Sequence, residues 1–260
     1  MKGPLAVIPL PNIFFDAPIA HRGLHDCDGM FGSGRSENSF AAFRMAIEHG
    51  YGIEVDIQLS ADGVPIVFHD YTLKRMFRIN KKVSDLPLEV LKRFRLENKE
   101  EIPTLEEFLK LVLGKVPILV ELKDQDWFAE KNMGVMESAV AKRLENYDGP
   151  VAVMSFNPRS IKTFGCCSPN IPRGLVTEAF DETHWPDLDK KKLMDLRSLV
   201  GVDEVSASFI SHECSDLDSD YLSQIPKYIK LFSWTIRNEK ELNLALKTSD
   251  NVTFEGFFPR

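Results

Sequence analysis

The chain contains 260 residues, of which 43% are hydrophobic, and its formal net charge is −7 at pH 7. This length and apolar fraction indicate one folded domain with a full core, which we expect to span residues 1–260. The acidic balance argues against a nucleic-acid-binding surface, so an anionic substrate would need a locally basic pocket.

The segment MKGPLAVIPLPNIFF at the start of the chain carries a single lysine, and prolines interrupt its apolar run. A signal peptide would need a basic region followed by a continuous apolar region. No apolar run in the chain approaches the ~20 residues that span a membrane. We therefore expect no signal peptide and no stable membrane anchor.

The cysteines show neither a CxxC pair nor the Cys/His spacing of a zinc site. Adjacent cysteines are poorly placed to bond to each other. The pattern favours reduced thiols in a cytoplasmic protein. The four cysteines are Cys27, Cys166, Cys167 and Cys214.

Strand-like and helix-like segments alternate along the chain, which predicts a parallel sheet with helical crossovers. Thr104 has the sequence of a capping-box helix start, and Gly114 fits the end of that helix. Residues 72–102 are rich in Lys, Arg and Glu. We expect this segment to form a solvent-exposed cover over the barrel rather than a separate domain. The predicted strands are 18–23, 52–59, 65–70, 116–123, 151–156, 173–178, 205–210, 231–236 and 252–257. The clearest helical patterns are 37–50, 103–114, 130–147 and 238–248.

One connection between predicted strands is too short for a crossover. Only the residues SADGV, 60–64, separate the second run from the third, whereas a parallel crossover needs about a dozen residues or more. The pair Asp62-Gly63 is typical of a hairpin turn, so residues 65–70 should fold back antiparallel. Eight strands remain, which favours a closed (β/α)₈ TIM barrel with a short hairpin inserted after the second strand.

Polar residues gather at the ends of the first predicted strands, where barrel enzymes carry their reacting groups. Residues two apart on a strand share a face, so Glu54 and Asp56 can point together into the barrel mouth. The hairpin should return His69 to the same rim. The residues expected at this rim are His21, Arg22, Glu54, Asp56, His69, Glu121 and Lys123.

Each type of side chain at this rim fits a step of phosphate chemistry. The three carboxylates form an all-oxygen set suited to Ca²⁺ or Mg²⁺. Arginine and lysine suit phosphate recognition, and two histidines can serve as general acid and general base. Each of these residue types taken alone has a structural explanation. A histidine at a strand end can serve only to hold the structure, Glu54 and Asp56 can lie on an exposed strand edge, and Glu121 and Lys123 can form a surface ion pair. The remaining histidines, expected at the surface or in structural roles, are His25, His49, His184 and His212.

The chain resembles the glycerophosphodiester phosphodiesterases in several sequence motifs spread along its length. These are AHRG (20–23), SENSFAAFRMAIEHGY (36–51), IEVDIQLSADGVPIVFHDYTLKR (53–75), IPTLEEFL (102–109), LVELK (119–123) and SWTIRN (233–238). The resemblance implies a TIM barrel that uses a divalent cation, Ca²⁺ or Mg²⁺. It also implies hydrolysis of a small-molecule glycerophosphodiester to sn-glycerol 3-phosphate and an alcohol.

The resemblance also implies a role for each matching residue. His21 and His69 are similar to the catalytic acid–base pair of the family. The implied metal ligands are Glu54, Asp56 and Glu121; the implied substrate contacts are Arg22 and Lys123 on phosphate and Trp234 on the glycerol carbons. Glu37 and Asn38 match a Glu-Asn pair that helps to order the site.

The chain departs from the family at its last strand, which reads VTFEGFFP where a Thr-Asp-x-Pro word is usual. Glu255 is the candidate counterpart of that aspartate. The segment after His69 is shorter than usual, which leaves the preferred alcohol open.

Two other functions stay open at this point. A phosphodiesterase acting on lysophospholipid or other phospholipid-derived diesters, like a phospholipase D, would need an apolar membrane-facing rim, to which Met30, Phe31 and Phe77 could contribute. A non-catalytic binding module on the same barrel would be expected to lack a histidine or a metal ligand, and all five are present.

Overall fold

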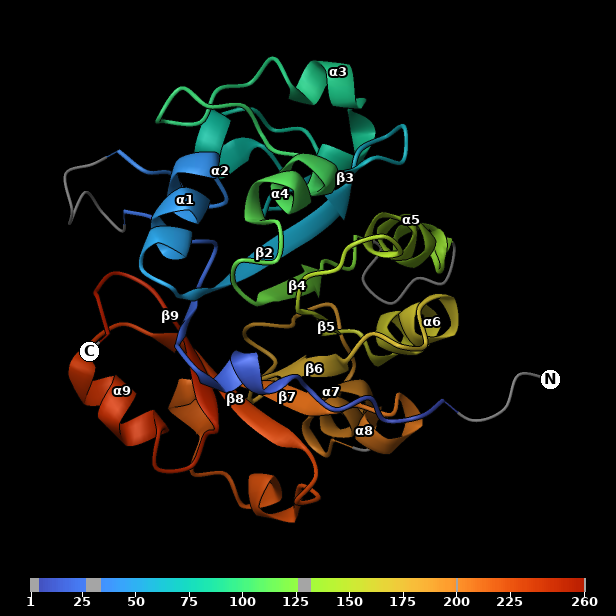
Figure 1. The fold of residues 1–260 in the computed structure, drawn as a ribbon. Coiled ribbons are helices and arrows are strands. Elements are labelled where there is room, and N and C mark those ends of the chain that lie inside the picture. The colour runs from blue at the N-terminus through green and yellow to red at the C-terminus, as the bar shows by residue number, and fades with distance from the viewer. Residues whose placement is uncertain (1–4, 27–33, 126–131, 200, 260) are drawn as a thin grey trace.

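The structure is a computed structural model, and it describes residues 5–26, 34–125, 132–199 and 201–259. Nine strands form one sheet, and helices surround it (Figure 1). The strands are β1 (Ile19–Ala20), β2 (Gly52–Leu59), β3 (Pro65–Val67), β4 (Ile118–Leu122), β5 (Val151–Ser155), β6 (Arg173–Thr177), β7 (Phe209–Glu213), β8 (Lys230–Ile236) and β9 (Asn251–Phe254).

The sheet closes on itself because β1 pairs in parallel with both β2 and β9. The strand order is β1-β9-β8-β7-β6-β5-β4-β2, and every pairing in that ring is parallel. β3 lies outside the ring and pairs antiparallel with β2. The predicted TIM barrel and its inserted hairpin are therefore confirmed.

The helices begin where the sequence provides side-chain caps. Ser39, Thr104, Asn157, Asp189 and Asn238 each accept a backbone N–H of the helix that follows, and Thr104 with Glu107 completes a capping box. The helices are α1 (Phe40–Glu48), α2 (Lys74–Phe77), α3 (Leu88–Leu91), α4 (Leu105–Val112), α5 (Val135–Leu144), α6 (Pro158–Cys167), α7 (Lys190–Arg197), α8 (Gly201–Glu204) and α9 (Glu239–Ala245). Within the described ranges, no helix is long and apolar enough to cross a membrane.

The hairpin turn follows the prediction. The N–H of Ser60 donates to the carbonyl of Val64 at 3.0 Å, and Gly63 takes the left-handed conformation with φ 75°. Beyond the turn, the amide of Gln58 donates to the carbonyls of Phe68, His69 and Asp70 at 2.7, 3.1 and 2.8 Å. A side chain of β2 therefore holds the segment that carries His69.

The bounds of one predicted strand are wrong. The seventh barrel strand spans Phe209–Glu213 rather than 205–210, because Val205 still belongs to the turn that ends α8 and donates its N–H to Gly201. An apolar run of that length does not reveal by itself where a helical turn ends and a strand begins. At the end of α4, Leu113 is the capping residue with φ 49°, and Gly114 follows it with φ 72°.

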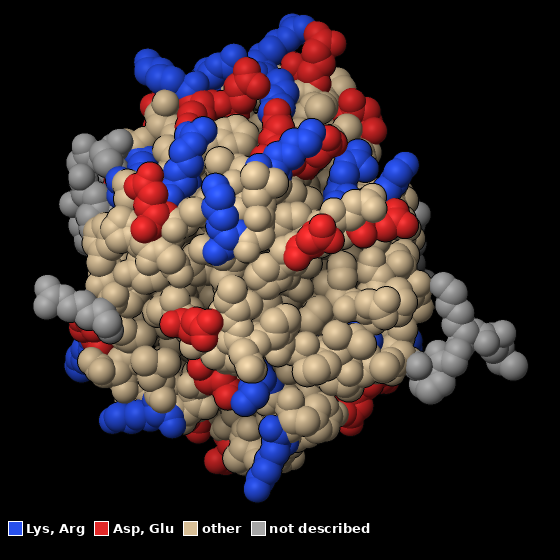
Figure 2. Space-filling model, in the orientation of Figure 1, with Lys and Arg blue, Asp and Glu red and all other residues tan. Residues whose placement is uncertain are grey.

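The cover over residues 72–102 is more than a solvated loop. It contains α2, α3 and a small apolar cluster that packs apart from the barrel core. The buried members of this cover cluster are Ile66, Phe68, Leu73, Val83, Leu86, Leu91, Leu96 and Ile102. Lysines and arginines mix with aspartates and glutamates on the face shown in Figure 2, most densely at the top of that view.

The chain before β1 closes the amino-terminal end of the barrel. Phe14 is fully buried among inward-facing residues of the strands, including Phe209 and Phe232. The amide of Asn251, the first residue of β9, donates to the carbonyls of Phe14 and Ala17 at 2.7 and 2.9 Å. The opposite, carboxyl-terminal end of the barrel is left for the site.

Candidate active site

The turn after β1 fixes the first two site residues. The N–H of His21 donates to the carbonyl of Phe254 at 2.9 Å, which extends the pairing with β9. Arg22 has φ 55°, and its N–H donates to Glu54 Oε2 at 3.0 Å. The N–H of Asn38 donates to the carbonyl of Arg22 at 2.9 Å. The backbone thus presents both side chains at the barrel mouth.

Three buried carboxylates lie together between β2 and β4. Asp56 and Glu121 are register partners, and Glu54 lies two residues before Asp56 on the same face. Each offers an oxygen within 4.8 Å of the others. Burial and the neighbouring charges of Asp56 and Glu121 raise the pKa of Glu54 well above its ordinary value. The strands therefore hold three like-charged groups closer than their own repulsion favours.

These carboxylates fit a hard divalent cation. The donor set is all oxygen, and Glu54 Oε1 is buried without a hydrogen-bond partner among the described residues. Two further groups in the described ranges bring ligand atoms together, His21-His25-Glu255 and Glu37-His69-Asp70. These groups mix histidine nitrogen with carboxylate oxygen, and such a donor set suits a hard cation less well than an all-oxygen set.

Two cations compensate part of this negative charge. Lys123 Nζ lies 2.8 Å from Glu121 Oε1 and 3.5 Å from Asp56 Oδ1, and Arg22 Nε lies 3.5 Å from Asp56 Oδ2. Burial opposes the charge on Lys123, but Glu121 and Asp56 raise its pKa above the ordinary value. Burial likewise opposes the charge on Asp56, but His69, Lys123 and Arg22 hold its pKa well below the ordinary value.

Each ring nitrogen of His21 lies near a carboxylate. Its Nδ1 lies 2.6 Å from Glu255 Oε2, and its Nε2 lies 4.0 Å from Glu54 Oε2. Burial and the charge of Arg22 lower the pKa of His21 to about 4, although Glu255 acts in the opposite direction. The imidazole is therefore neutral at neutral pH, with Nε2 toward the carboxylates.

His69 has a carboxylate and an arginine behind it as well. Its Nδ1 lies 2.8 Å from Asp70 Oδ1, and Arg75 Nε donates to Asp70 Oδ2 at 2.7 Å. Arg75 also donates two hydrogen bonds to Glu37, at 2.8 and 2.6 Å, and Glu37 accepts a third from Arg22 Nη1 at 3.0 Å. This network joins the hairpin to the turn after β1.

A cavity of about 190 Å³ unites these groups. Trp234 forms part of its wall; the indole N–H donates to the carbonyl of Ser211 at 3.0 Å, and its ring meets Phe156 edge-on. Asp56 belongs to the carboxylate group beside the cavity. The other predicted site residues that line it are His21, Arg22, Glu54, His69, Glu121, Lys123 and Trp234.

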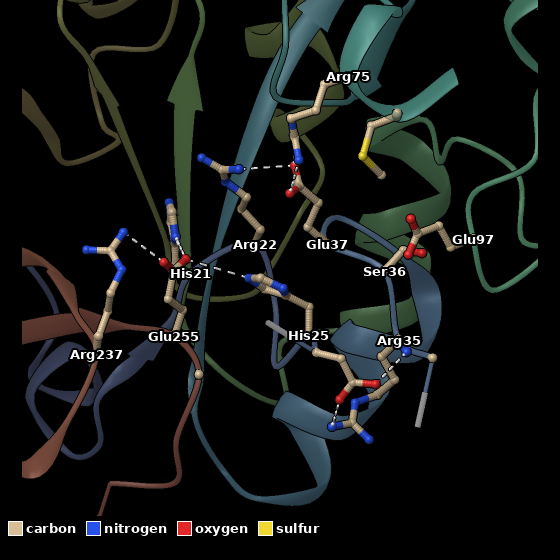
Figure 3. A pocket seen from close by; sticks show the side chains of 14 residues that line it. His21, Arg22, His25, Arg35, Ser36, Glu37, Arg75, Glu97, Arg237 and Glu255 are labelled. Carbon is tan, nitrogen blue, oxygen red and sulfur yellow. Dashed lines mark hydrogen bonds and ion pairs between the residues drawn. The ribbon is translucent and has the colours of Figure 1, made fainter. Parts of the chain in front are cut away.

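A larger outer hollow of about 730 Å³ adjoins this cavity and shares His21, Arg22 and Arg237 with it. Figure 3 shows the side chains around this outer hollow. Glu37 lines the hollow, and the amide of the neighbouring Asn38 donates to Asp56 Oδ2 at 2.9 Å. The predicted Glu-Asn pair therefore contacts the site from the turn before α1.

The sequence pattern did not predict a place in the site for two residues of this hollow, His25 and Arg237. His25, expected at the surface or in a structural role, is buried in its wall with Nε2 3.7 Å from Glu255 Oε2. Arg237 pairs with Glu255 Oε1 at 2.9 Å. Only the position of Glu255 after the last strand gave a signal, through the resemblance.

The remaining histidines and the residues considered for an apolar rim lie outside the site or outside the described residues. His49 and His184 are exposed, while His212 is fully buried with Nδ1 2.8 Å from Thr177 Oγ1. Phe77 packs in the cover cluster against Phe68 and Phe94. Cys27, Met30 and Phe31 lie outside the described residues.

A closed (β/α)₈ barrel with histidines, buried carboxylates and cations at its carboxyl-terminal rim defines a barrel enzyme equipped for phosphate chemistry. A glycerophosphodiester phosphodiesterase of Caldanaerobacter subterraneus is 28% identical over 88% of this chain and 89% of its own. One from Bacillus altitudinis is 32% identical over 67% and 71%. A phosphodiesterase structure from Oleispira antarctica shares the fold with a TM-score of 0.72, at 24% identity over 93% of each chain.

The model of the glycerophosphoryl diester phosphodiesterase family matches residues 21–252. The chain belongs to this family. The expectation of a phosphodiesterase is confirmed at that level. The predicted site residues from His21 to Trp234 lie within the matched range, whereas Glu255 follows it.

Proposed function

We propose that this protein hydrolyses glycerophosphodiesters to sn-glycerol 3-phosphate and an alcohol, with a divalent cation, Ca²⁺ or Mg²⁺, held by Glu54, Asp56 and Glu121. The observation that carries the proposal is the meeting of two histidines, three buried carboxylates and two cations at one cavity. The Oleispira antarctica relative was solved with sn-glycerol-3-phosphate, which supports this choice of product. We also propose a cytoplasmic location.

We assign a task in this reaction to each side chain of the cavity. Arg22 and Lys123 contact the phosphate, and the enclosed wall at Trp234 packs on the glycerol carbons. One histidine removes a proton from the nucleophile, and the other protonates the departing alkoxide. The alcohol leaves through the outer hollow, which shares His21 and Arg22 with the cavity. A bound cation supplies neutralisation of the phosphate charge.

A panel of soluble glycerophosphodiesters tests this function directly. We expect release of sn-glycerol 3-phosphate, measured with a coupled glycerol-3-phosphate dehydrogenase assay. EDTA should abolish the release, and added Ca²⁺ or Mg²⁺ should restore it. Release of glycerol together with a phosphorylated alcohol would mean that the enzyme cuts the other ester bond, and the proposed product would be wrong.

Replacing Arg22 or Lys123 with alanine should lower kcat/KM by about 10- to 100-fold. Loss of one hydrogen bond to a charged group costs roughly 1.5–3 kcal/mol, and about 1.4 kcal/mol corresponds to tenfold. Steady-state kinetics on a soluble diester provide the measurement. Lys110→Ala, which removes an exposed lysine paired with Glu106 on α4, is the matched control. Wild-type kinetics in both site variants would remove these residues from the phosphate contact.

Soluble diesters should be cleaved far faster than phospholipid in vesicles. Phe77, one of the residues considered for an apolar rim, is engaged in the cover cluster rather than presented to a bilayer. Initial rates on glycerophosphoethanolamine and on phosphatidylethanolamine vesicles at equal phosphodiester concentration give the comparison. Equal or faster turnover of the vesicles would favour the lipid-active alternative.

A further inference from the structure

The two histidines of the cavity, His21 and His69, each have a carboxylate at Nδ1. His21 Nδ1 meets Glu255 Oε2 at 2.6 Å, and His69 Nδ1 meets Asp70 Oδ1 at 2.8 Å. In each case an arginine pairs with the same carboxylate: Arg237 lies 2.9 Å from Glu255 Oε1, and Arg75 lies 2.7 Å from Asp70 Oδ2. Each imidazole therefore has a carboxylate and a guanidinium behind it.

A carboxylate at Nδ1 decides which nitrogen of a neutral imidazole carries the proton. An ionised carboxylate only accepts hydrogen bonds, so Nδ1 must donate and Nε2 keeps its lone pair. Removing such a carboxylate can leave the histidine in place but in the wrong tautomer, with a large loss of rate. For His21, Nε2 is the nitrogen that points toward Glu54.

The partner of His69 is its neighbour in the chain, whereas Glu255 lies 234 positions from His21 in the sequence and follows the last barrel strand, β9. The N–H of Glu255 donates to the carbonyl of Ile236 at 2.9 Å, and the N–H of His21 donates to Phe254. Arg237 is itself anchored, because Nη1 donates to the carbonyl of Thr235 at 3.2 Å. Closure of the barrel thus brings Glu255 to His21 (Figure 3).

We propose that Glu255, held by Arg237, is the positioning residue that keeps His21 in the tautomer with Nδ1 protonated and Nε2 directed into the cavity. The carboxylate contacts His21 rather than the cavity's reacting atoms, and it acts through the imidazole. A competing role as a metal ligand with His21 and His25 is less favoured, because Glu255 already pairs with Arg237 and with Nδ1 of His21. The inference rests on the proposed function only for its kinetic consequence.

The direct test is the tautomer of His21 in Glu255→Gln. Histidine-¹⁵N-labelled protein is examined at mildly alkaline pH, and His21→Ala assigns the resonance. Long-range ¹H–¹⁵N correlation should show Nδ1–H in the wild type and a mixture of tautomers, or Nε2–H, in Glu255→Gln. An unchanged Nδ1–H tautomer in the folded variant would overturn the proposal.

Kinetics give the second readout. Glu255→Gln should lower kcat by at least about tenfold while KM stays within about twofold, because Glu255 does not line the inner cavity proposed to hold the phosphate and glycerol. Glu255→Asp, which keeps the charge, should recover part of that loss. A loss confined to KM, or an aspartate variant no better than the glutamine variant, would contradict the positioning role.

Arg237→Ala keeps the proposal testable if Glu255→Gln fails to fold. The Arg237 side chain is 60% exposed, so its removal should leave the fold intact and release Glu255 from one side. We expect the same shift in tautomer with a smaller loss of kcat. Arg93→Ala, which removes a similarly exposed arginine from its pair with Glu89, is the control and should change neither.

The two readouts separate this inference from the proposed function. A wild-type enzyme that cleaves no glycerophosphodiester would remove the function, while the tautomer of His21 would still decide the inference. A cleaving enzyme with His21 unaffected by Glu255→Gln would remove the inference alone.

Discussion

Glu121→Gln and Asp56→Asn will each reduce turnover by about 10³-fold, and EDTA will do the same to the wild type. A cation on a transferring phosphoryl group provides several kcal/mol of stabilisation, and each ~1.4 kcal/mol is tenfold in rate. Each substitution removes one charge from the buried oxygen set while keeping nearly the same shape. Rates on a soluble diester over a range of Ca²⁺ and Mg²⁺ concentrations provide the measurement. Full activity in a thoroughly chelated sample would exclude the metal role.

A readout that does not depend on activity accompanies this prediction. Glu54, Asp56 and Glu121 repel one another in the buried site, so a bound cation should stabilise the fold. A ligand at 100 times its Kd stabilises the native state by about 2.7 kcal/mol. The Tm should therefore rise with Ca²⁺ or Mg²⁺ in the wild type and in the surface control Glu106→Gln, but not in Glu121→Gln.

His21→Ala and His69→Ala should each lose about 10²- to 10⁴-fold in kcat, because general acid–base groups typically contribute that much. Both imidazoles line the same cavity. The double variant should lose less than the product of the single losses, since groups that act as a unit are not additive. Single-turnover kinetics on one diester measure all three variants.

Two controls sharpen the histidine experiment. The cation-dependent rise in Tm should survive in both variants, because neither histidine is assigned as a ligand. His49→Ala, at the exposed histidine that caps the carboxyl end of α1 and lines neither the cavity nor the outer hollow, should leave kcat unchanged. If either His21→Ala or His69→Ala retains wild-type turnover, the two-histidine mechanism is wrong.

The barrel was predictable because its signals are local. Period and length identify the strands, and the five-residue link with Asp62-Gly63 identifies the hairpin. The spacing of Glu54 and Asp56 on one strand face follows from strand geometry alone. Placing these groups beside Glu121 then required only the order of neighbouring parallel strands.

The rest of the site depends on contacts that no local pattern contains. Glu255 and His21 lie 234 positions apart in sequence and meet only because β9 closes the ring against β1. The place of His25 beside them follows from the same closure. The start of β7 was misjudged for a related reason, since packing of α8 decides where the apolar run around Val205 turns into a strand.

The cover offers a route by which this enzyme can diverge. Apart from Ile66 on β3 and Phe68 beside His69, its apolar cluster is separate from the barrel core, so a lineage can exchange the other residues within it without loosening the strands that hold the chemistry. Met76 and Glu97 from this region line the outer hollow, where the alcohol is proposed to leave. Drift in the cover can therefore change which diester is accepted while selection on the barrel rim stays constant. New substrate ranges can then arise through a series of variants that all keep their catalytic groups.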